Sequence, residues 1–346
     1  MRSLSGQSDF FGLDLGGTAI RVVELKGTGN LRELVRYGYA PLEGTIGISD
    51  ADADKAKVKA VLEQLLKQVG ISTKKVAVNL PSNHVFTTVI DLDRMAGAEL
   101  SKTIRYQADS FIPTPLAESK IDWAMIGDSP KDPKKVEVLL SSVPNKYVEA
   151  RLDLLESIGL NVLAFEPDNM ALARSLVPID SKAPQLLIDI GSAATDLVIC
   201  VGQVPHLSRS IAVGQQAIVQ AASQRLGIDI AQAHQFVFKF GLGKDKLEGQ
   251  IYNAIVPTVD GLAAEIDKSI KFFQGRYPTA KLEKLIVTGG ASTLPEFPLY
   301  LANKFGINVE IGNSWRNITV PASQQNEAAS VSNQFAIAAG LAEREA

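Results

Sequence analysis

The stretch FGLDLGGTAIRVV at residues 11–23 recurs, with the same pattern of apolar and small residues, as LLIDIGSAATDLV at residues 186–198. In each copy an apolar strand carries an aspartate near its end, a turn of small residues follows, and a second apolar strand leaves the turn. The pattern predicts a β-hairpin, where a Rossmann unit would have a helix after the first strand. An internal repeat of this kind predicts two similar lobes in an α/β protein.

Both turns carry the residue types that bind a phosphate chain. Small residues allow backbone N–H groups to converge on phosphate oxygens. The predicted contacts are Gly16, Gly17, Thr18 and Ala19 in the first copy, and Gly191, Ser192, Ala193 and Thr195 in the second. One such turn alone would equally suit an ordinary hairpin. Two copies favour a nucleotide held between the lobes.

Charged residues of the two copies add the features of a metal site. Magnesium in proteins is usually held by one or two carboxylates together with phosphates and water. Asp14 and Asp189, which lie near the ends of the two first strands, are therefore the predicted metal ligands. Arg21 lies on the strand that leaves the first turn, and we expect it to direct positive charge toward the terminal phosphate.

Three further segments complete the predicted site. An apolar strand at residues 285–288 ends in a turn of small residues, Gly289, Gly290 and Ala291. Such a turn would let a base and ribose approach the backbone. Gly214, after the second hairpin, is assigned to the same site. Glu166 is the candidate catalytic residue, because its carboxylate would face the metal or the attacking water, although an acid there equally suits a helix N-terminus.

Composition and charge exclude several classes of protein. The 346 residues are 46% hydrophobic with a net charge of −3, which is typical of a globular protein and lacks the basic surface that nucleic-acid binding requires. Residues 1–8 have no apolar signal-peptide core, and no stretch approaches the ~18 apolar residues of a membrane span. The single Cys200 is predicted to be a buried, reduced thiol. We therefore expect a cytoplasmic protein that associates with a membrane only through a partner.

The residues between the two hairpins predict an inserted module of order β-α-β-β-α. Its helices carry apolar stripes, and Asn145 is the expected N-cap of the second one. Elsewhere, Pro257 is expected near a helix start, and a last helix is expected at 327–343. The predicted division is a lobe 1 core at 1–80, 164–183 and 325–346, the module at 81–163, a lobe 2 core at 184–212 and 282–324, and a helical subdomain at 213–281.

The order of these segments resembles the actin, Hsp70 and hexokinase superfamily over nearly the whole chain. The shared order is hairpin, Glu-Pro helix, hairpin, Gly-Gly-Ala strand end, and a closing alanine-rich helix at residues 326–341. The resemblance implies an actin-like ATPase fold, in which two ribonuclease-H-like lobes hold ATP and Mg²⁺ between them.

The inserted module is similar to that of the type IV pilus assembly protein PilM family. The resemblance rests on residues 104–113, which end in Ile112-Pro113, and on residues 118–123, 138–159 and 171–174. That family resembles the cell-division protein FtsA in carrying a 1C, or SHS2, module. The resemblance implies an ATP-binding component of the pilus platform, cytoplasmic and peripheral to the inner membrane, that binds the N-terminal cytoplasmic peptide of a PilN-like membrane protein. Other platform proteins, assembly ATPases and copies of the chain itself are the further partners it implies.

Two segments depart from the pattern of the superfamily. Relatives carry Gly-Gly and then Thr after the second hairpin, where this chain has Gly214-Gln215 and then Ile218. Relatives carry Ala-Glu-x-x-Lys near the ribose, where this chain has AHQFV at residues 233–237. We hypothesise that the nucleotide binds weakly or acts as a structural clamp, with little or no turnover.

Two other functions fit part of the pattern. An FtsA-like filament protein shares the module, but the C-terminal membrane helix of that class is missing from the sequence. A sugar kinase of the glucokinase and repressor type shares the turn LDLGGT at residues 13–18. No aspartate in a matching sugar-pocket context accompanies that turn, and one cysteine cannot form the zinc site of those kinases. The pilus function is therefore preferred.

Overall fold

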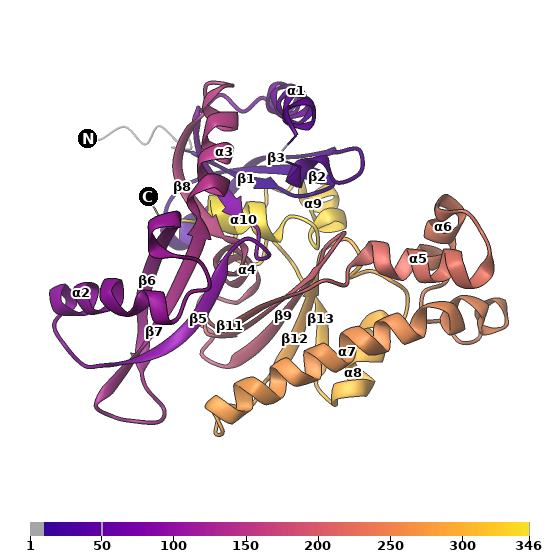
Figure 1. Cartoon of the computed structure of the whole chain (residues 1–346). Helices are drawn as coiled ribbons and strands as arrows, with labels where there is room; N and C mark the ends of the chain where they lie inside the picture. Colours follow the sequence, from indigo (N-terminus) through magenta and orange to yellow (C-terminus); the bar gives the residue numbers. More distant parts are fainter. Residues whose placement is uncertain (1–9, 50, 346) are drawn as a thin grey trace.

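The computed structural model describes residues 10–49 and 51–345. Figure 1 shows two lobes, one above the other, with a smaller module beside them. Residues 1–8, which lack a signal-peptide core, lie outside the described range. None of the described helices is both long and apolar enough to cross a bilayer.

Lobe 1 is a five-stranded sheet of order β3-β2-β1-β4-β8. Its strands are β1 (Phe11–Leu15), β2 (Ala19–Lys26), β3 (Glu33–Pro41), β4 (Lys75–Leu80) and β8 (Asn161–Pro167). Strand β1 is buried along its whole length because helices cover both faces of the sheet. Apolar side chains of α1 pack on one face, and α4 and α10 lie on the other. These helices are α1 (Asp52–Val69), α4 (Asp168–Leu176) and α10 (Ala336–Ala342).

Lobe 2 repeats this topology in a sheet of order β11-β10-β9-β12-β13. Its strands are β9 (Pro184–Ile190), β10 (Thr195–Val201), β11 (Val204–Ile211), β12 (Lys284–Thr288) and β13 (Asn308–Ile311). Each lobe has an antiparallel hairpin extended by a third antiparallel strand and by two parallel strands on the other side. The repeat in the sequence therefore corresponds to a repeat in the fold, as predicted. Cys200 lies fully buried in this sheet.

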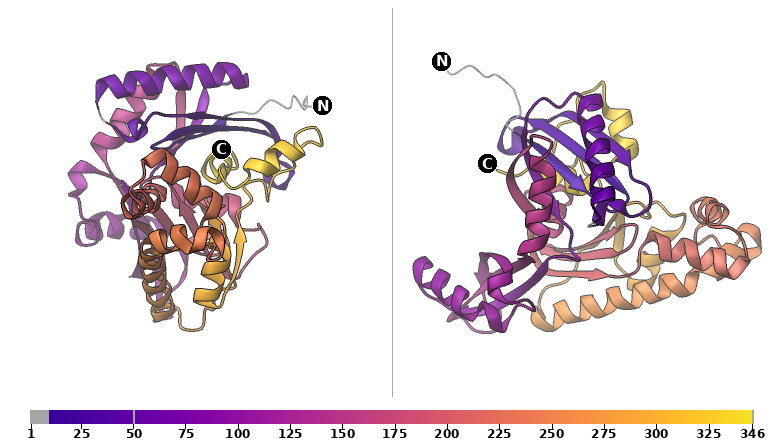
Figure 2. Two further views of the ribbon diagram at one scale, coloured as in Figure 1. Left: turned by 90° about the vertical axis from the view of Figure 1, so that its right-hand side faces the viewer. Right: turned by 45° about the horizontal axis from the view of Figure 1, so that its top comes forward.

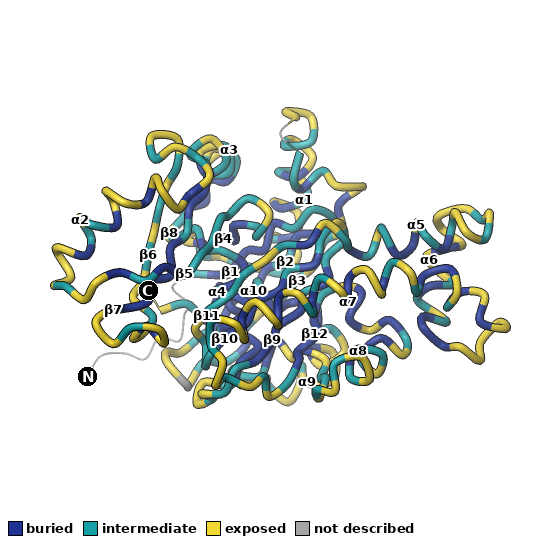
Figure 3. The backbone as a smooth tube through the Cα atoms, turned by 60° about the horizontal axis from the view of Figure 1, so that its bottom comes forward, coloured by how far each residue is buried: buried dark blue, intermediate teal, exposed yellow. Residues whose placement is uncertain are grey.

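Helices form the outer part of lobe 2. They are α5 (Gln215–Leu226), α6 (Ile230–Phe240), α7 (Gln250–Arg276) and α8 (Phe297–Phe305), with a 3-10 turn η5 (Lys246–Gly249) before α7. Figure 2 shows α7 running along lobe 2 so that its C-terminal end reaches the inserted module. In Figure 3 the strands of both lobes are mostly buried, whereas the peripheral loops are exposed.

The inserted module is a three-stranded antiparallel sheet of order β5-β7-β6. Its elements are β5 (Phe86–Asp93), α2 (Gly97–Gln107), η3 (Ala108–Ser110), η4 (Leu116–Glu118), β6 (Ser119–Asp128) and β7 (Lys135–Pro144). Apolar side chains of α2, among them Leu100 and Ile104, pack against the sheet and give the module a core of its own. The predicted order β-α-β-β is observed in the module, and the helix predicted after its last strand is α3 (Asn145–Glu156).

The predicted end of the module, at residue 163, falls inside strand β8 (Asn161–Pro167) of the lobe 1 sheet. Helix α3 (Asn145–Glu156) places Leu155 in the core of lobe 1, together with Phe11 of β1 and Leu62 of α1. Strand β8 begins at Asn161 and pairs with β4. Strand β8 is thus part of the lobe 1 sheet, whereas α3 packs on both sides, because its Val148 contacts Val143 of β7.

Three local predictions about helices were wrong. Asn145 is the first residue of α3 rather than its N-cap, and its side-chain amide donates to the carbonyl of Ala117 at 3.1 Å. Pro257 lies inside α7, where the apolar packing of that long helix outweighs the hydrogen bond that proline removes. The expected helix at 327–343 is interrupted between α9 (Gln325–Val331) and α10, since the backbone carbonyl of Asn333 accepts from Gly289 N at 2.8 Å.

Candidate nucleotide site

A cleft of about 490 Å³ lies between the two lobes, and we call it the interlobe cleft. Most of the residues predicted for the site line it: Asp14, Gly16, Gly17, Thr18, Ala19, Arg21, Asp189, Gly191, Ser192, Ala193, Gly289 and Gly290. The sheets bring them together because both hairpin turns and the end of β12 open toward the gap between the lobes. Its size is within the range of ordinary ligand pockets.

The two hairpin turns have the same backbone geometry. Gly16 N donates to Ala19 O at 3.0 Å in the first turn, and Gly191 N donates to Ala194 O at 2.9 Å in the second. Helix α5 fixes the second turn, since Gln215 N donates to Gly191 O at 2.9 Å. The chain thus presents two equivalent turns of small residues to one cavity, which is the arrangement that a phosphate chain requires.

Four carboxyl groups gather along the cleft: Asp14, Asp168, Asp189 and Asp196. Burial raises the pKa of Asp189 to about 7, and the nearby charges of Asp196 and Asp14 add to the rise while Arg21 opposes it. Burial also raises the pKa of Asp168 well above its ordinary value, and the other three carboxylates contribute. Crowded, buried carboxylates of this kind favour a bound cation, which would stabilise their ionised forms.

Arg21 forms an ion pair with one of these four carboxylates. Its Nη1 lies 3.1 Å from Oδ2 of Asp14, and its guanidinium lies 5.4 Å from the ring centroid of Tyr39. Burial raises the pKa of Asp14, which the guanidinium opposes. Among the described residues, no three His, Cys, Asp or Glu side chains are placed to hold a metal by themselves. The donor set therefore fits a magnesium ion that keeps water and phosphate oxygens as most of its ligands.

The end of β12 approaches the second aspartate very closely. Gly289 has φ +85°, and a Cβ atom at this position would lie 2.3 Å from Oδ1 of Asp189. Only glycine fits both the backbone conformation and the space. The turn is also tied to the chain before α10, because Asn333 O accepts from Gly289 N and from Thr288 Oγ1, each at 2.8 Å.

Three predicted residues support the cleft without lining it. Thr195 is buried, and its hydroxyl donates to Val213 O at 2.6 Å. Gly214 lies behind the second turn, at the start of α5. Ala291 is buried in the core of lobe 2. A Cβ atom at Gly214 would lie 2.6 Å from Ser192 O, so α5 can start this close to the second turn only with glycine at that position.

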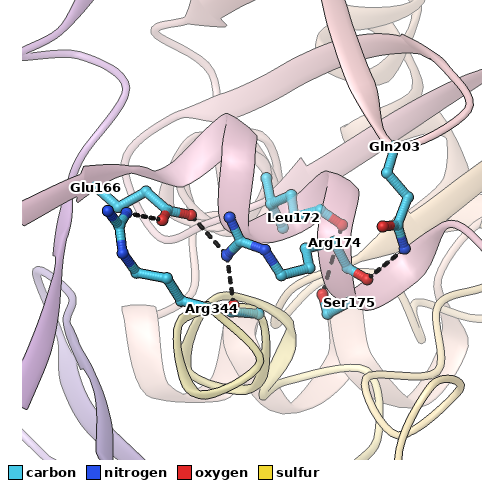
Figure 4. Close-up of polar contacts among 7 residues, drawn as sticks. Glu166, Leu172, Arg174, Ser175, Gln203 and Arg344 are labelled. Atoms are coloured by element: carbon cyan, nitrogen blue, oxygen red, sulfur yellow. Dashed lines mark hydrogen bonds and ion pairs between the residues drawn. The ribbon is translucent and has the colours of Figure 1, made fainter. Parts of the chain in front are cut away.

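The expected position of Glu166 is corrected by the structure. Its carboxylate points away from the interlobe cleft and is paired with Arg174 at 2.7 Å and with Arg344 at 2.6 Å, as Figure 4 shows. Arg174 also donates to Gly340 O at 2.6 Å, which ties α4 to α10. Asp168, two residues later, lines the cleft instead, and Asn79 donates to it at 3.1 Å. Asn79 lies near the end of β4 and Asp168 directly follows β8, and these two strands are parallel neighbours. Polar residues at these two strand ends were the signal in the sequence that could have assigned Asn79 and Asp168 to the cleft.

The helical side of the cleft contains residues that the sequence patterns did not assign. Gln215 and His234 both line it, and their side-chain Nε2 atoms lie 3.0 Å apart. The His234 ring stacks on Phe238 with ring centroids 4.6 Å apart. Since the Gln215 side chain lies next to Gly290, this end offers a flat aromatic surface near a glycine turn, which suits a planar ring. The segment that departs from the superfamily pattern therefore still lines the site.

A second cleft, of about 340 Å³, lies between the inserted module and lobe 1, and we call it the module cleft. The module contributes Ile121, Trp123 and Leu139 to it, and lobe 1 contributes Phe165, Met170 and the Glu166 ion pairs. Strand β6, which carries Trp123, is at the edge of its sheet. A groove with apolar pockets and an edge strand is the type of surface that binds an extended peptide.

Several solved structures share this fold. A chain of a PilM-PilN type IV pilus biogenesis complex is 23% identical, with a TM-score of 0.80 over 97% of this chain and 98% of that one. The ethanolamine utilization protein EutJ from Carboxydothermus hydrogenoformans is 14% identical, with a TM-score of 0.57 over 96% and 88%. MreB5 of Spiroplasma citri, solved with AMPPNP, is 15% identical, with a TM-score of 0.54 over 96% and 94%.

Two lobes of equal topology, with paired hairpin turns around one cleft, define an actin-like ATPase fold, and these structures show the same fold. The model of the family of the type IV pilus assembly protein PilM matches residues 12–346. The chain therefore belongs to the PilM family. This result confirms the resemblance seen in the inserted module, and it does not favour the filament or sugar-kinase alternatives.

Proposed function

We propose that the protein is a nucleotide-dependent adaptor of the type IV pilus assembly platform. The observation that carries the proposal is the interlobe cleft, in which two equivalent turns of small residues face buried carboxylates from both lobes. ATP is the proposed nucleotide, with its phosphates between the turns at Gly16–Thr18 and Gly191–Ala193 and its base near Gly289, Gly290 and Phe238. A nucleotide bound there would contact both lobes and hold them together.

Magnesium is the proposed metal, with Asp14 and Asp189 as its protein ligands, directly or through water. When bound, it would neutralise phosphate charge. Arg21 would supply further positive charge, and Asn79 holds Asp168 in place through a hydrogen bond of 3.1 Å. We propose that turnover is slow or absent, because Glu166, the carboxylate expected to act on the attacking water, lies outside the cleft and is paired with Arg174 and Arg344.

The second part of the proposal concerns the partner. The complex with a TM-score of 0.80 joins a PilM chain to PilN, and we propose that this chain likewise binds the N-terminal cytoplasmic peptide of a PilN-like membrane protein. The module cleft is the proposed site, since Ile121 and Trp123 provide apolar contacts and β6 provides an edge strand. This binding would place the protein in the cytoplasm, at the inner membrane, through its partner. Other platform proteins, assembly ATPases and further copies of the chain are proposed as additional partners.

Calorimetry of the full chain against the N-terminal peptide of a PilN-type protein, with and without Mg-ATP, tests the proposal. Trp123 gives a second signal, because it lines the module cleft whereas the other tryptophan, Trp315, is buried elsewhere. We expect saturable peptide binding that changes tryptophan emission and a spectroscopic response that is lost in Trp123→Phe. A chain that binds no such peptide in either condition would contradict the partner proposal, and a chain that binds no Mg-ATP would contradict the nucleotide proposal.

A further inference from the structure

An ionic cluster joins the inserted module to lobe 2. Arg276, the last residue of α7, donates Nε to Oε1 of Glu137 at 2.8 Å and Nη2 to Oδ1 of Asp91 at 2.9 Å. The hydroxyl of Tyr277 donates to the same oxygen of Glu137 at 2.8 Å. Asp91 lies on β5 and Glu137 on β7, both in the module. We call these four residues the clasp.

The clasp is largely shielded from water. The side chain of Glu137 is 3% exposed and that of Arg276 is 17% exposed. His206 of β11 packs its ring edge-on against Tyr277, with centroids 5.4 Å apart, so a second element of lobe 2 closes the cluster. A guanidinium can donate to two carboxylates at once in a fixed geometry. Opening the clasp would leave Glu137 buried without its cation, which is unfavourable.

The module is held differently on its other side. Toward lobe 1 it has an apolar contact, in which Val143 of β7 packs with Leu80 of β4 and Val148 of α3, and beside that contact it lines the module cleft, an open groove of about 340 Å³. Toward lobe 2 it has the clasp, and β5 lies against β11. The module is inserted in the sequence of lobe 1, yet its buried ionic contacts are with lobe 2. Figure 1 and the right-hand view of Figure 2 show the end of α7 beside the module.

We infer that the clasp makes the module move with lobe 2, so that the binding of Mg-nucleotide between the lobes changes the shape of the module cleft. The interlobe cleft has walls from lobes 1 and 2, and the module cleft has walls from lobe 1 and the module. If the module follows lobe 2, any rotation of lobe 2 against lobe 1 alters both clefts together. Arg276 is thus a positioning residue that couples the two sites, although it lines neither of them.

This inference rests on the proposed function, because it requires a nucleotide in one cleft and a peptide in the other. Coupling between two binding sites is reciprocal: the factor by which nucleotide changes peptide affinity equals the factor by which peptide changes nucleotide affinity. Typical coupling factors in proteins are about 5 to 150. Both factors can be measured with the full chain, and agreement between them checks the measurement.

The test measures the dissociation constant of a PilN-type N-terminal peptide with and without saturating Mg-ATP. We expect the two dissociation constants of the wild-type chain to differ about fivefold or more. In Arg276→Met the same two constants should differ by less than about twofold, so that their ratio is close to one. The matched control is Arg209→Met, which removes an Arg-carboxylate pair with Glu265 at 2.7 Å that joins β11 to α7 and lies wholly within lobe 2. The control should keep the wild-type ratio.

The outcomes separate the coupling from the function that it rests on. Binding of both ligands to the wild-type chain with a ratio of one overturns the coupling and leaves the proposed function intact. A wild-type ratio retained in Arg276→Met overturns the role of the clasp. Failure of the wild-type chain to bind either ligand overturns the proposed function and the coupling with it. Should Arg276→Met not fold, Asp91→Asn removes one charge at a partly exposed position, and an unchanged ratio in that variant also overturns the inference.

Discussion

Glu166 and Asp168 lie two residues apart, and their side chains line different clefts. Glu166 is on β8 and faces the module cleft, where it pairs with Arg174 and Arg344. Asp168 is the first residue of α4 and faces the interlobe cleft, beside Asn79. Residues two apart in a strand share one face of the sheet, but the change from strand to helix after Pro167 turns the second carboxylate to the other side.

This relationship predicts that the two acids can be separated by substitution. Asp168→Asn should weaken the binding of Mg-ATP about tenfold, which is ~1.4 kcal/mol. The affinity for the peptide, measured without nucleotide, should be unchanged. Glu166→Gln should alter peptide affinity and leave Mg-ATP affinity measured without peptide unchanged. Calorimetry of both variants with both ligands checks the pair. Loss of Mg-ATP binding in Glu166→Gln would place that residue at the nucleotide site, as expected from the sequence.

Asp189→Asn should have opposite effects on the free and the ligand-bound protein. Burial raises the pKa of Asp189 to about 7 from 3.8, so at pH 8 the folded protein holds an ionised carboxylate at a cost. The amide removes that cost, and we expect the free protein to gain ~1 kcal/mol, or about 2 °C in Tm. The increase in Tm that Mg-ATP produces in the wild type should disappear.

Thermal unfolding at pH 8 with and without Mg-ATP measures both effects of Asp189→Asn. The control is Asp245→Asn, which removes a carboxylate from an exposed loop. It should leave the response to Mg-ATP unchanged. A full Tm response in Asp189→Asn would exclude this residue as a metal ligand.

The stability of the fold should depend on pH through Glu343. Burial raises the pKa of this carboxyl from 4.5 to about 8, which the charges of Arg32 and Arg174 oppose. The folded state therefore binds the proton more tightly than the unfolded state, and the favourable contribution of Glu343 falls as the pH rises from 4.5 to 8. Glu343→Gln should be nearly neutral at about pH 5 and stabilising by on the order of 2 kcal/mol above pH 8. Urea unfolding across this range would contradict the assignment if the advantage of the variant shrank as the pH rose.

Two glycines in helices should respond oppositely to alanine. In α10, a Cβ atom at Gly340 would lie 1.9 Å from the carbonyl oxygen of Ala171, so Gly340→Ala should separate α10 from α4 and cost about 1–3 kcal/mol or more. In α7, Gly261 has no atom within 4 Å of such a Cβ, and Gly261→Ala should stabilise by ~0.5–1 kcal/mol through helix propensity. Denaturant unfolding of both variants compares them directly. Equal losses would indicate that α10 is not packed as closely as described.

Much of the fold could be predicted because its signals are local. The two hairpins, with Asp14 and Asp189 near the ends of their first strands, repeat within about a dozen residues each, and short-range patterns of apolar and small residues specify them. The same patterns did not assign α3 to a lobe, because an amphipathic stripe does not say which surface it will cover. They also did not show the break before α10, which depends on hydrogen bonds from Gly289 and Thr288 to Asn333, more than forty residues away.

By itself, the sequence determined the two lobes, the two hairpin turns of small residues, the order of strands and helix in the module and the family of the protein, since each depends on contiguous residues. Only the tertiary structure decided which carboxylates share a cleft, and it placed Asp168 rather than Glu166 beside Asp189. It alone joined Arg276 to Asp91 and Glu137, residues more than a hundred positions apart. Burial and charge proximity arise from the packing of distant segments, and a linear pattern of residues does not contain that information.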